Sequence, residues 1–104
     1  MIVREAKIIK DVFAKDIEFK KTRDGFGEAI LELGETNKNV VVLTADLKGS
    51  TRVTAFAENY AERFVEVGVA EQALEALKRE VDNYGKVPFI TSFAIFSPGR
   101  NWEQ

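Results

Sequence analysis

The stretch VEVGVAEQALEALKREVDNY, residues 65–84, decides the expected fold because it passes from a strand through a turn into a helix. Its first residues are mostly apolar and β-branched, as in a buried strand, and Gly68 permits the turn that follows. From residue 70 onward, apolar side chains recur at the spacing of one helix face, and Gly85 is expected to end the helix. The residues of this apolar face are Ala70, Ala73, Leu74, Leu77, Val81 and Tyr84.

The opposite side of this expected helix is densely charged. Its residues are Glu71, Glu75, Lys78 and Asp82. Glu75 also stands four residues before Arg79, the favourable order for an ion pair on a helix surface. Because burying such charges without partners is costly, we expect this side of the helix to face water. The simplest interpretation of Glu71 is then an exposed carboxylate that interacts with the helix dipole.

Two further apolar segments, residues 39–44 and 87–91, are expected to be strands. A helix is expected at residues 22–33, ending at Gly34, and a shorter one near residues 53–60. Helices that alternate with strands in this rhythm predict right-handed βαβ units and a parallel sheet. We therefore expect a single α/β domain, a small three-layer fold with a parallel sheet of three or four strands flanked by helices. Such a fold is half of a doubly wound domain.

The first 21 residues differ from the rest in pattern. We expect residues 1–21 to be an N-terminal arm or an edge strand, with the α/β domain at residues 22–104. A sheet of three strands has two unpaired edges, and unpaired edges invite association. We therefore expect that the arm pairs with one edge or that the chain forms a homodimer.

Composition excludes several classes of function. The net charge is −2 with acids and bases interspersed, which is unlike a nucleic-acid-binding protein. No apolar run approaches the roughly 18 residues that a membrane span needs. The chain has no cysteine and no histidine, so thiolate chemistry is excluded and only oxygen ligands remain for a metal. We expect no metal site and a cytoplasmic location, and acid–base chemistry would fall to carboxylates, lysine or tyrosine.

Several motifs, in a fixed order, together resemble the pyrimidine-binding domain of transketolases. They include TRDGFGEA at residues 22–29, VLTADL at 42–47, GVAEQ at 68–72, PFITSFA at 88–94 and PGRNWEQ at 98–104. The chain looks most like the split bacterial and archaeal kind, in which this domain begins a separate C-terminal subunit.

The resemblance implies a cofactor and four site residues. In that family, thiamine diphosphate and Mg²⁺ bind between two domains, usually of different subunits, and a two-carbon ketol unit passes from a ketose to an aldose. Glu71 matches the glutamate that hydrogen-bonds the aminopyrimidine ring and so favours the tautomer that accepts a proton from the thiazolium ring. Phe93 and Phe96 match the aromatic pair beside the ring, and Asp46 matches an acidic residue near the cofactor. Their simpler interpretations are core aromatics and a turn former.

Three departures from the family's pattern affect the expected function. The helix after Glu71 is charged where the family has small residues, and the chain stops at Gln104, before the family's domain is complete. No Gly-Asp-Gly motif followed by paired asparagines is present to hold a diphosphate.

From these departures we expect a truncated, engineered or minimised fragment of a transketolase domain. It would have no catalytic activity and no bound cofactor of its own, and the four site residues would be idle. The alternative is a partner-dependent fragment of a transketolase C-terminal subunit, which contributes the aminopyrimidine half-site to a diphosphate-binding subunit. A third interpretation is a scaffold for studying how half of a doubly wound sheet folds.

Overall fold

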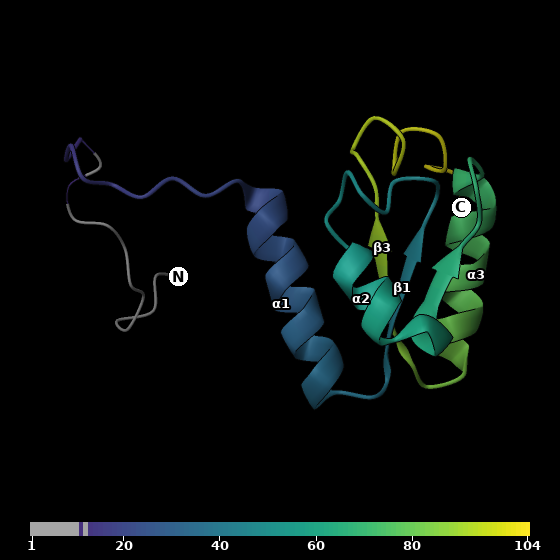
Figure 1. Ribbon diagram of the computed structural model, residues 1–104. Coiled ribbons are helices and arrows are strands. Elements are labelled where there is room, and N and C mark those ends of the chain that lie inside the picture. Colours follow the sequence, from purple (N-terminus) through teal and green to yellow (C-terminus); the bar gives the residue numbers. More distant parts are fainter. Residues whose placement is uncertain (1–10, 12) are drawn as a thin grey trace, which may run out of the picture.

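The computed structural model describes residue 11 and residues 13–104, which form a three-stranded sheet between helices (Figure 1). In chain order the elements are α1 (Thr22–Thr36), β1 (Val40–Thr44), α2 (Thr54–Asn59), the 3₁₀ helix η1 (Ala61–Arg63), β2 (Phe64–Glu66), α3 (Glu71–Asn83) and β3 (Val87–Thr91). None of the helices described here has the length and hydrophobicity to cross a bilayer. The predicted α/β class, with a parallel sheet flanked by helices, is confirmed.

β1 lies at the centre of the sheet, whose order is β2-β1-β3 with both pairs parallel. In the strand register, Val42 of β1 is the partner of Phe64 on one side and of Phe89 on the other. A central parallel strand is covered on both faces, which explains the uninterrupted run VVVLT.

Alternate residues of β1 point into two separate cores, because successive side chains of a strand face opposite sides of the sheet. Figure 1 shows the layers, with α1 and α2 on one side of the sheet and α3 on the other. The buried members of the core under α1 and α2 are Ile30, Val40, Val42, Val53 and Phe56. The buried members of the core under α3 are Leu43, Ala45 and Leu74.

Gly34 lies inside α1 rather than at its end. The prediction that the helix ends at this glycine is wrong, because α1 continues to Thr36. A Cβ atom at position 34 would lie 2.6 Å from the ring of Phe56 and 2.8 Å from the ring of Tyr60. Glycine is therefore needed here for the close approach of α1 to these two rings, not as a helix cap.

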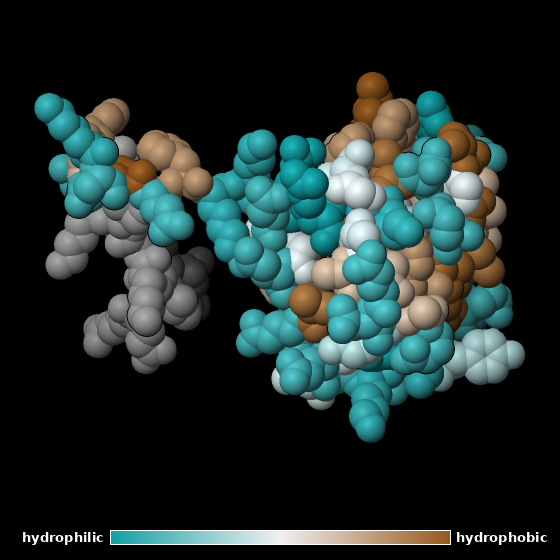
Figure 2. Space-filling model, viewed as in Figure 1, coloured by the Kyte–Doolittle hydropathy of each residue, from teal (hydrophilic) through white to brown (hydrophobic). Residues whose placement is uncertain are grey.

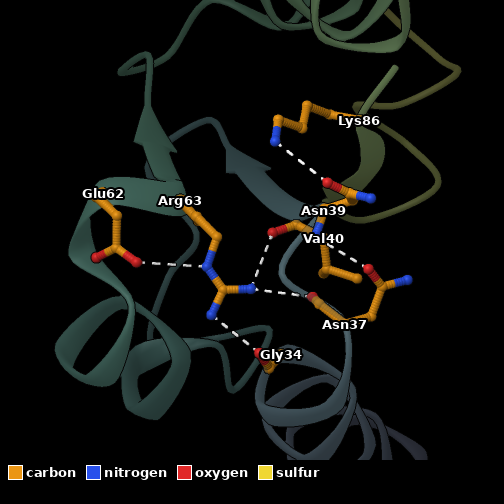
Figure 3. A network of polar contacts seen from close by, with 7 residues as sticks. All are labelled: Gly34, Asn37, Asn39, Val40, Glu62, Arg63 and Lys86. Atoms are coloured by element: carbon orange, nitrogen blue, oxygen red, sulfur yellow. Dashed lines mark hydrogen bonds and ion pairs between the residues drawn. The ribbon is translucent and has the colours of Figure 1, made fainter. Parts of the chain in front are cut away.

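Arg63 ties the end of α1 to the start of β1 (Figure 3). Its guanidinium group donates hydrogen bonds to the carbonyl oxygens of Gly34 at 2.9 Å, Asn37 at 3.1 Å and Val40 at 3.5 Å. The guanidinium carbon also lies 4.2 Å from the centroid of the Tyr60 ring. Because the last carbonyl groups of a helix have no partner within it, this side chain supplies a donor to Gly34 and a second donor to Asn37, which also accepts from the N–H of Val40.

The N-terminal half of α1 contacts the loop between β1 and α2. Arg52 in that loop has a positive φ of 64° and donates from Nε to Oδ1 of Asp24 at 2.7 Å. The hydrogen bond and charge of Arg52 hold the pKa of Asp24 below its ordinary value. One turn of helix away, Gly27 is buried against the backbone of Arg52.

Gly27→Ala is expected to lower the free energy of unfolding by about 1–3 kcal/mol. The added Cβ would lie 2.4 Å from the carbonyl oxygen of Arg52, so α1 and the loop would have to separate. Gly25→Ala is the matched control, because its Cβ would meet no atom within 4 Å, and the better helix propensity of alanine should raise stability slightly. Urea denaturation measures both variants, and an equal loss of stability in the two would contradict the argument.

α3 occupies nearly the range predicted for it, but its faces are only partly as expected. Leu74 is completely buried, whereas Leu77 and Tyr84 on the expected apolar face are 41% and 82% exposed. The predicted pair between Glu75 and Arg79 is wrong, because the carboxylate of Glu75 lies 4.0 Å from Nζ of Lys78 instead. A three-stranded sheet is too narrow to cover the whole apolar face of this helix.

The expectation for residues 1–21 falls largely outside the described residues. Within residues 13–21 the chain makes turns and contains no strand, and this segment leads away from the domain (Figure 1). β2 and β3 are therefore the edges of the sheet that the structure describes. The division of the chain after residue 21 stays a prediction, as does covering of a sheet edge by the arm.

Candidate functional site

The candidate site lies at the carboxyl ends of the parallel strands. The loop after β1 leads to α2 on one face of the sheet, and the loop after the neighbouring β2 leads to α3 on the other face. Loops that diverge in this way from adjacent strands leave a crevice, which is where open α/β sheets bind ligands. Asp46 follows β1 by two residues and Glu71 begins α3, so the topology alone brings both carboxylates to the crevice.

Three of the four residues chosen from the sequence line one pocket. The pocket has a volume of about 200 Å³ and is lined by Ala45, Asp46, Leu47, Val69, Glu71, Phe96 and Arg100. Phe93 lines a separate open pocket of about 410 Å³, between the N-terminus of α1 and the end of β3. The rings of Phe93 and Phe96 still lie near each other, with centroids 6.2 Å apart, so the two aromatics separate two neighbouring depressions.

Glu71 is buried, which contradicts the expectation that it faces water. The residue is 5% exposed, and both of its carboxylate oxygens accept hydrogen bonds from Nη1 of Arg100 at 3.3 Å. Asn101, itself buried, donates from Nδ2 to the backbone carbonyl of Glu71 at 3.2 Å and to Oγ of Ser97 at 3.0 Å. The segment after β3 therefore packs over the first turn of α3. The spacing of apolar residues within α3 could not predict this burial, because the buried side of Glu71 is contacted by residues that come later in the sequence.

Glu66, which the sequence analysis did not select, connects the two loops that form the crevice. Oε1 of Glu66, at the end of β2, accepts hydrogen bonds from the backbone N–H of Asp46 at 2.8 Å and of Gly68 at 3.0 Å. Asp46 has a positive φ of 59° and Gly68 one of 68°, so both turns are sharp. An acid placed at the last residue of a strand, just before a glycine turn, was the available signal for this role.

Arg100 is the second functional residue that sequence analysis missed. Its guanidinium carbon lies 4.6 Å from the centroid of the Phe96 ring, and its Nη1 binds Glu71. It thus contacts two of the four predicted site residues. The residue stands within the motif at residues 98–104, but nothing in the local pattern indicates which group it would pair with.

The mouth of the site is apolar. Figure 2 shows hydrophobic residues at the edge of the domain where Figure 1 places the segment after β3. The exposed hydrophobic residues of this region include Val69, Phe93 and Ile95. Within residues 13–104, no three acidic side chains are grouped as metal ligands.

The pocket suits one flat heterocyclic ring better than a whole cofactor. Complete small-molecule sites usually measure about 300–1,000 Å³, whereas this pocket measures about 200 Å³. A second, open depression of about 630 Å³ adjoins it at the start of α3 and shares Val69, Glu71 and Arg100 with it. The buried carboxylate can bind a ring nitrogen, and Phe96 offers an aromatic face for stacking.

Comparison with known proteins gives a consistent result. Residues 19–104 match the family model of the transketolase pyrimidine-binding domain. A putative transketolase C-terminal section from Methanocaldococcus jannaschii is 45% identical over 85 residues, which are 82% of this chain and 27% of the relative. One subunit of the apulose-4-phosphate transketolase from Phocaeicola vulgatus is 34% identical over 82 residues, 79% of this chain and 26% of the relative.

A solved structure is similar over the same part of the chain. It is described as a split gene transketolase, inactive beta4 tetramer, and it matches with a TM-score of 0.70 and 44% identity. The match covers 79% of this chain and 27% of that chain. The chain therefore spans about a quarter of the length of these relatives.

Proposed function

Because this chain belongs to the transketolase family, through its pyrimidine-binding domain, we propose that it supplies the aminopyrimidine half of a thiamine diphosphate site. A diphosphate-binding partner subunit supplies the other half. The observation that carries the proposal is the buried carboxylate of Glu71, which lines one small pocket together with Asp46 and Phe96.

In the proposed site Glu71 and Phe96 contact the ring, and Glu66 supports the loops around it. Glu71, whose side chain is only 6% exposed, accepts a hydrogen bond from, or donates one to, a ring nitrogen, and such bonds are stronger for a buried group than at the surface. Phe96 stacks on the ring, a contact worth about 0.5–1.5 kcal/mol beyond burial. Glu66 fixes the loops that carry Asp46 and Gly68. The bound cofactor would supply the carbon centre through which a two-carbon ketol unit passes from a ketose to an aldose.

Dependence on a partner is supported by the size of the pocket and by the relatives. The pocket of about 200 Å³ is below the usual size of a complete small-molecule site. One relative is named as a C-terminal section and another as a single subunit of a transketolase, and the solved relative is described as an inactive tetramer of one kind of subunit. These names are the ones expected of proteins that carry half of a site.

Self-association is a further part of the proposal. Leu77 and Tyr84 stand seven residues apart on one side of α3, and both are exposed. Among the described residues, the edge strands β2 and β3 are each paired on one side only, and unpaired edges invite association. Sedimentation at several concentrations tests this, because a chain that stays monomeric throughout would exclude a homodimer.

The proposed function is tested by calorimetric titration of thiamine diphosphate with Mg²⁺. The chain alone, a diphosphate-binding transketolase subunit alone, and their mixture are compared. We expect tight binding and ketol transfer only in the mixture. Lys38→Ser, an exposed residue in the turn between α1 and β1 that lines none of these pockets, is the control for non-specific effects. Failure of the mixture to bind or react, with a correctly folded chain, would favour the alternative of an engineered or minimised fragment whose site residues are idle.

A further inference from the structure

The guanidinium group of Arg100 lies in the place that the proposed function assigns to the aminopyrimidine ring. It contacts both oxygens of Glu71 at 3.3 Å, and its carbon lies 4.6 Å from the centroid of the Phe96 ring. All three side chains line the same pocket of about 200 Å³. We propose that Arg100 acts as an internal substitute for the ring: it holds the Glu71 carboxylate in position and must move aside when a pyrimidine binds. The inference rests on the proposed function.

The chemistry of the two groups explains how one could replace the other. A guanidinium group and an aminopyrimidine are both flat and both contain nitrogen atoms bonded to a shared carbon. A guanidinium group donates to a carboxylate from its N–H groups, whereas an aminopyrimidine donates from its amino group, and from a ring nitrogen only when that nitrogen carries a proton. Both can stack on an aromatic ring through a face. They therefore need the same two surfaces, the carboxylate of Glu71 and the ring of Phe96, and cannot use them at the same time.

The burial of the two partners shows which of them can move. The side chain of Arg100 is 52% exposed and that of Glu71 is 6% exposed. Within the described part of the chain, the guanidinium group of Arg100 forms hydrogen bonds with Glu71 alone. Arg100 can consequently swing into water, where its charge is solvated, whereas Glu71 stays where it is.

The exchange keeps a partner on the buried carboxylate throughout. Removing the partner of a buried charge is strongly destabilising, so a pocket that opened without Arg100 would be a poor resting state. With Arg100 present, Glu71 is hydrogen-bonded before the ligand arrives and is hydrogen-bonded to the ligand afterwards. Arg100 is thus a positioning residue for Glu71, and the fraction of chains in which it is displaced sets the apparent affinity for the ring.

The covering segment does not depend on Arg100 for its attachment to α3. Asn101 bonds the backbone of Glu71 and the hydroxyl of Ser97 independently of the ion pair. Substitution of Arg100 should therefore leave residues 97–101 in place, and thermal unfolding measures separately the stability lost when the Glu71 carboxylate loses its charged partner.

The test measures binding of thiamine, which carries the aminopyrimidine ring without the diphosphate, to the chain alone. The ring-proton NMR signals of Phe93 and Phe96 report on occupancy, and thermal unfolding of every variant confirms that it is folded. We expect Arg100→Gln to bind thiamine about tenfold more tightly than the wild-type chain, because the competing group is gone. Arg100→Lys should fall between them, and Lys38→Gln, which removes an exposed cation in the turn between α1 and β1, should match the wild type.

A second comparison assigns the effect to Glu71. In a Glu71→Ala background, Arg100→Gln should no longer tighten binding, because the carboxylate for which the two groups compete is absent. In the wild-type complex, the Nη1–H protons of Arg100, which bond Glu71 in the free chain, should also exchange with water faster than in the free chain.

Each outcome has one meaning. Equal affinity of the wild type and Arg100→Gln would overturn the competition while leaving the proposed function standing. Weaker binding by Arg100→Gln would make Arg100 a ligand contact and overturn its role as a substitute. Absence of thiamine binding in every folded variant would overturn this inference together with the proposed half-site.

Discussion

Glu71→Gln is expected to lower ketol-transfer activity by about 10²–10⁴-fold in the mixture of this chain with its diphosphate-binding partner, the range typical of lost acid–base catalysis. Glutamine has nearly the shape of glutamate and can still accept a hydrogen bond from Arg100. It cannot exchange a proton with a ring nitrogen, so the pocket is preserved while its chemistry is lost. Steady-state kinetics should show the loss in kcat more than in KM.

The matched control is Glu75→Gln, one turn further along α3. Glu75 lies near Lys78 and does not line the pocket, so its substitution should leave kcat close to that of the wild type. Thermal unfolding of both variants separates inactivity from unfolding. A folded Glu71→Gln chain with wild-type kcat would show that the burial of this carboxylate has no catalytic meaning.

Arg63→Met is expected to lower the free energy of unfolding by about 3 kcal/mol, near the upper end for single substitutions. Methionine fills much of the space but donates nothing, which leaves the carbonyl groups of Gly34, Asn37 and Val40 without the donor shown in Figure 3. The contact of the guanidinium group with the Tyr60 ring is lost as well.

Two companion variants make this result specific. Arg63→Lys keeps the charge but not the planar fork of donors, so it should recover only part of the stability. Arg23→Met removes an exposed arginine of α1 and should change stability by less than about 0.5 kcal/mol. Urea denaturation measures all three. A small effect of Arg63→Met would mean that water satisfies these carbonyl groups equally well.

Much of the fold could be predicted because its signals are local. The apolar run of β1 is long enough to mark a strand buried on both faces, and the pattern of residues 70–84 closely matches α3. Gly85, with a φ of 72°, ends α3 as a C-terminal glycine should. The position of Asp46 beyond β1 also follows directly from the parallel order of the strands.

The features that could not be predicted depend on contacts between distant segments. Arg63 reaches back to α1, Glu66 joins two loops, and Arg100 reaches the start of α3 from 29 residues away. The local sequence pattern of each segment does not predict these pairings. The burial of Glu71 was missed for the same reason. The expectation of a redesigned, inactive fragment assumed in part that Glu71 is exposed, and that assumption is wrong.

The position of β1 between two strands that follow it in the sequence has a consequence for synthesis on the ribosome. Val40 pairs with Val87, and Thr44 with Thr91. A nascent chain that has emerged only as far as residue 86 can pair β1 with β2. The other edge of β1 has no partner strand until β3 has emerged. The interval between the emergence of β1 and the emergence of residues 87–91 is therefore the one in which this chain is most open to wrong pairing and to capture by chaperones.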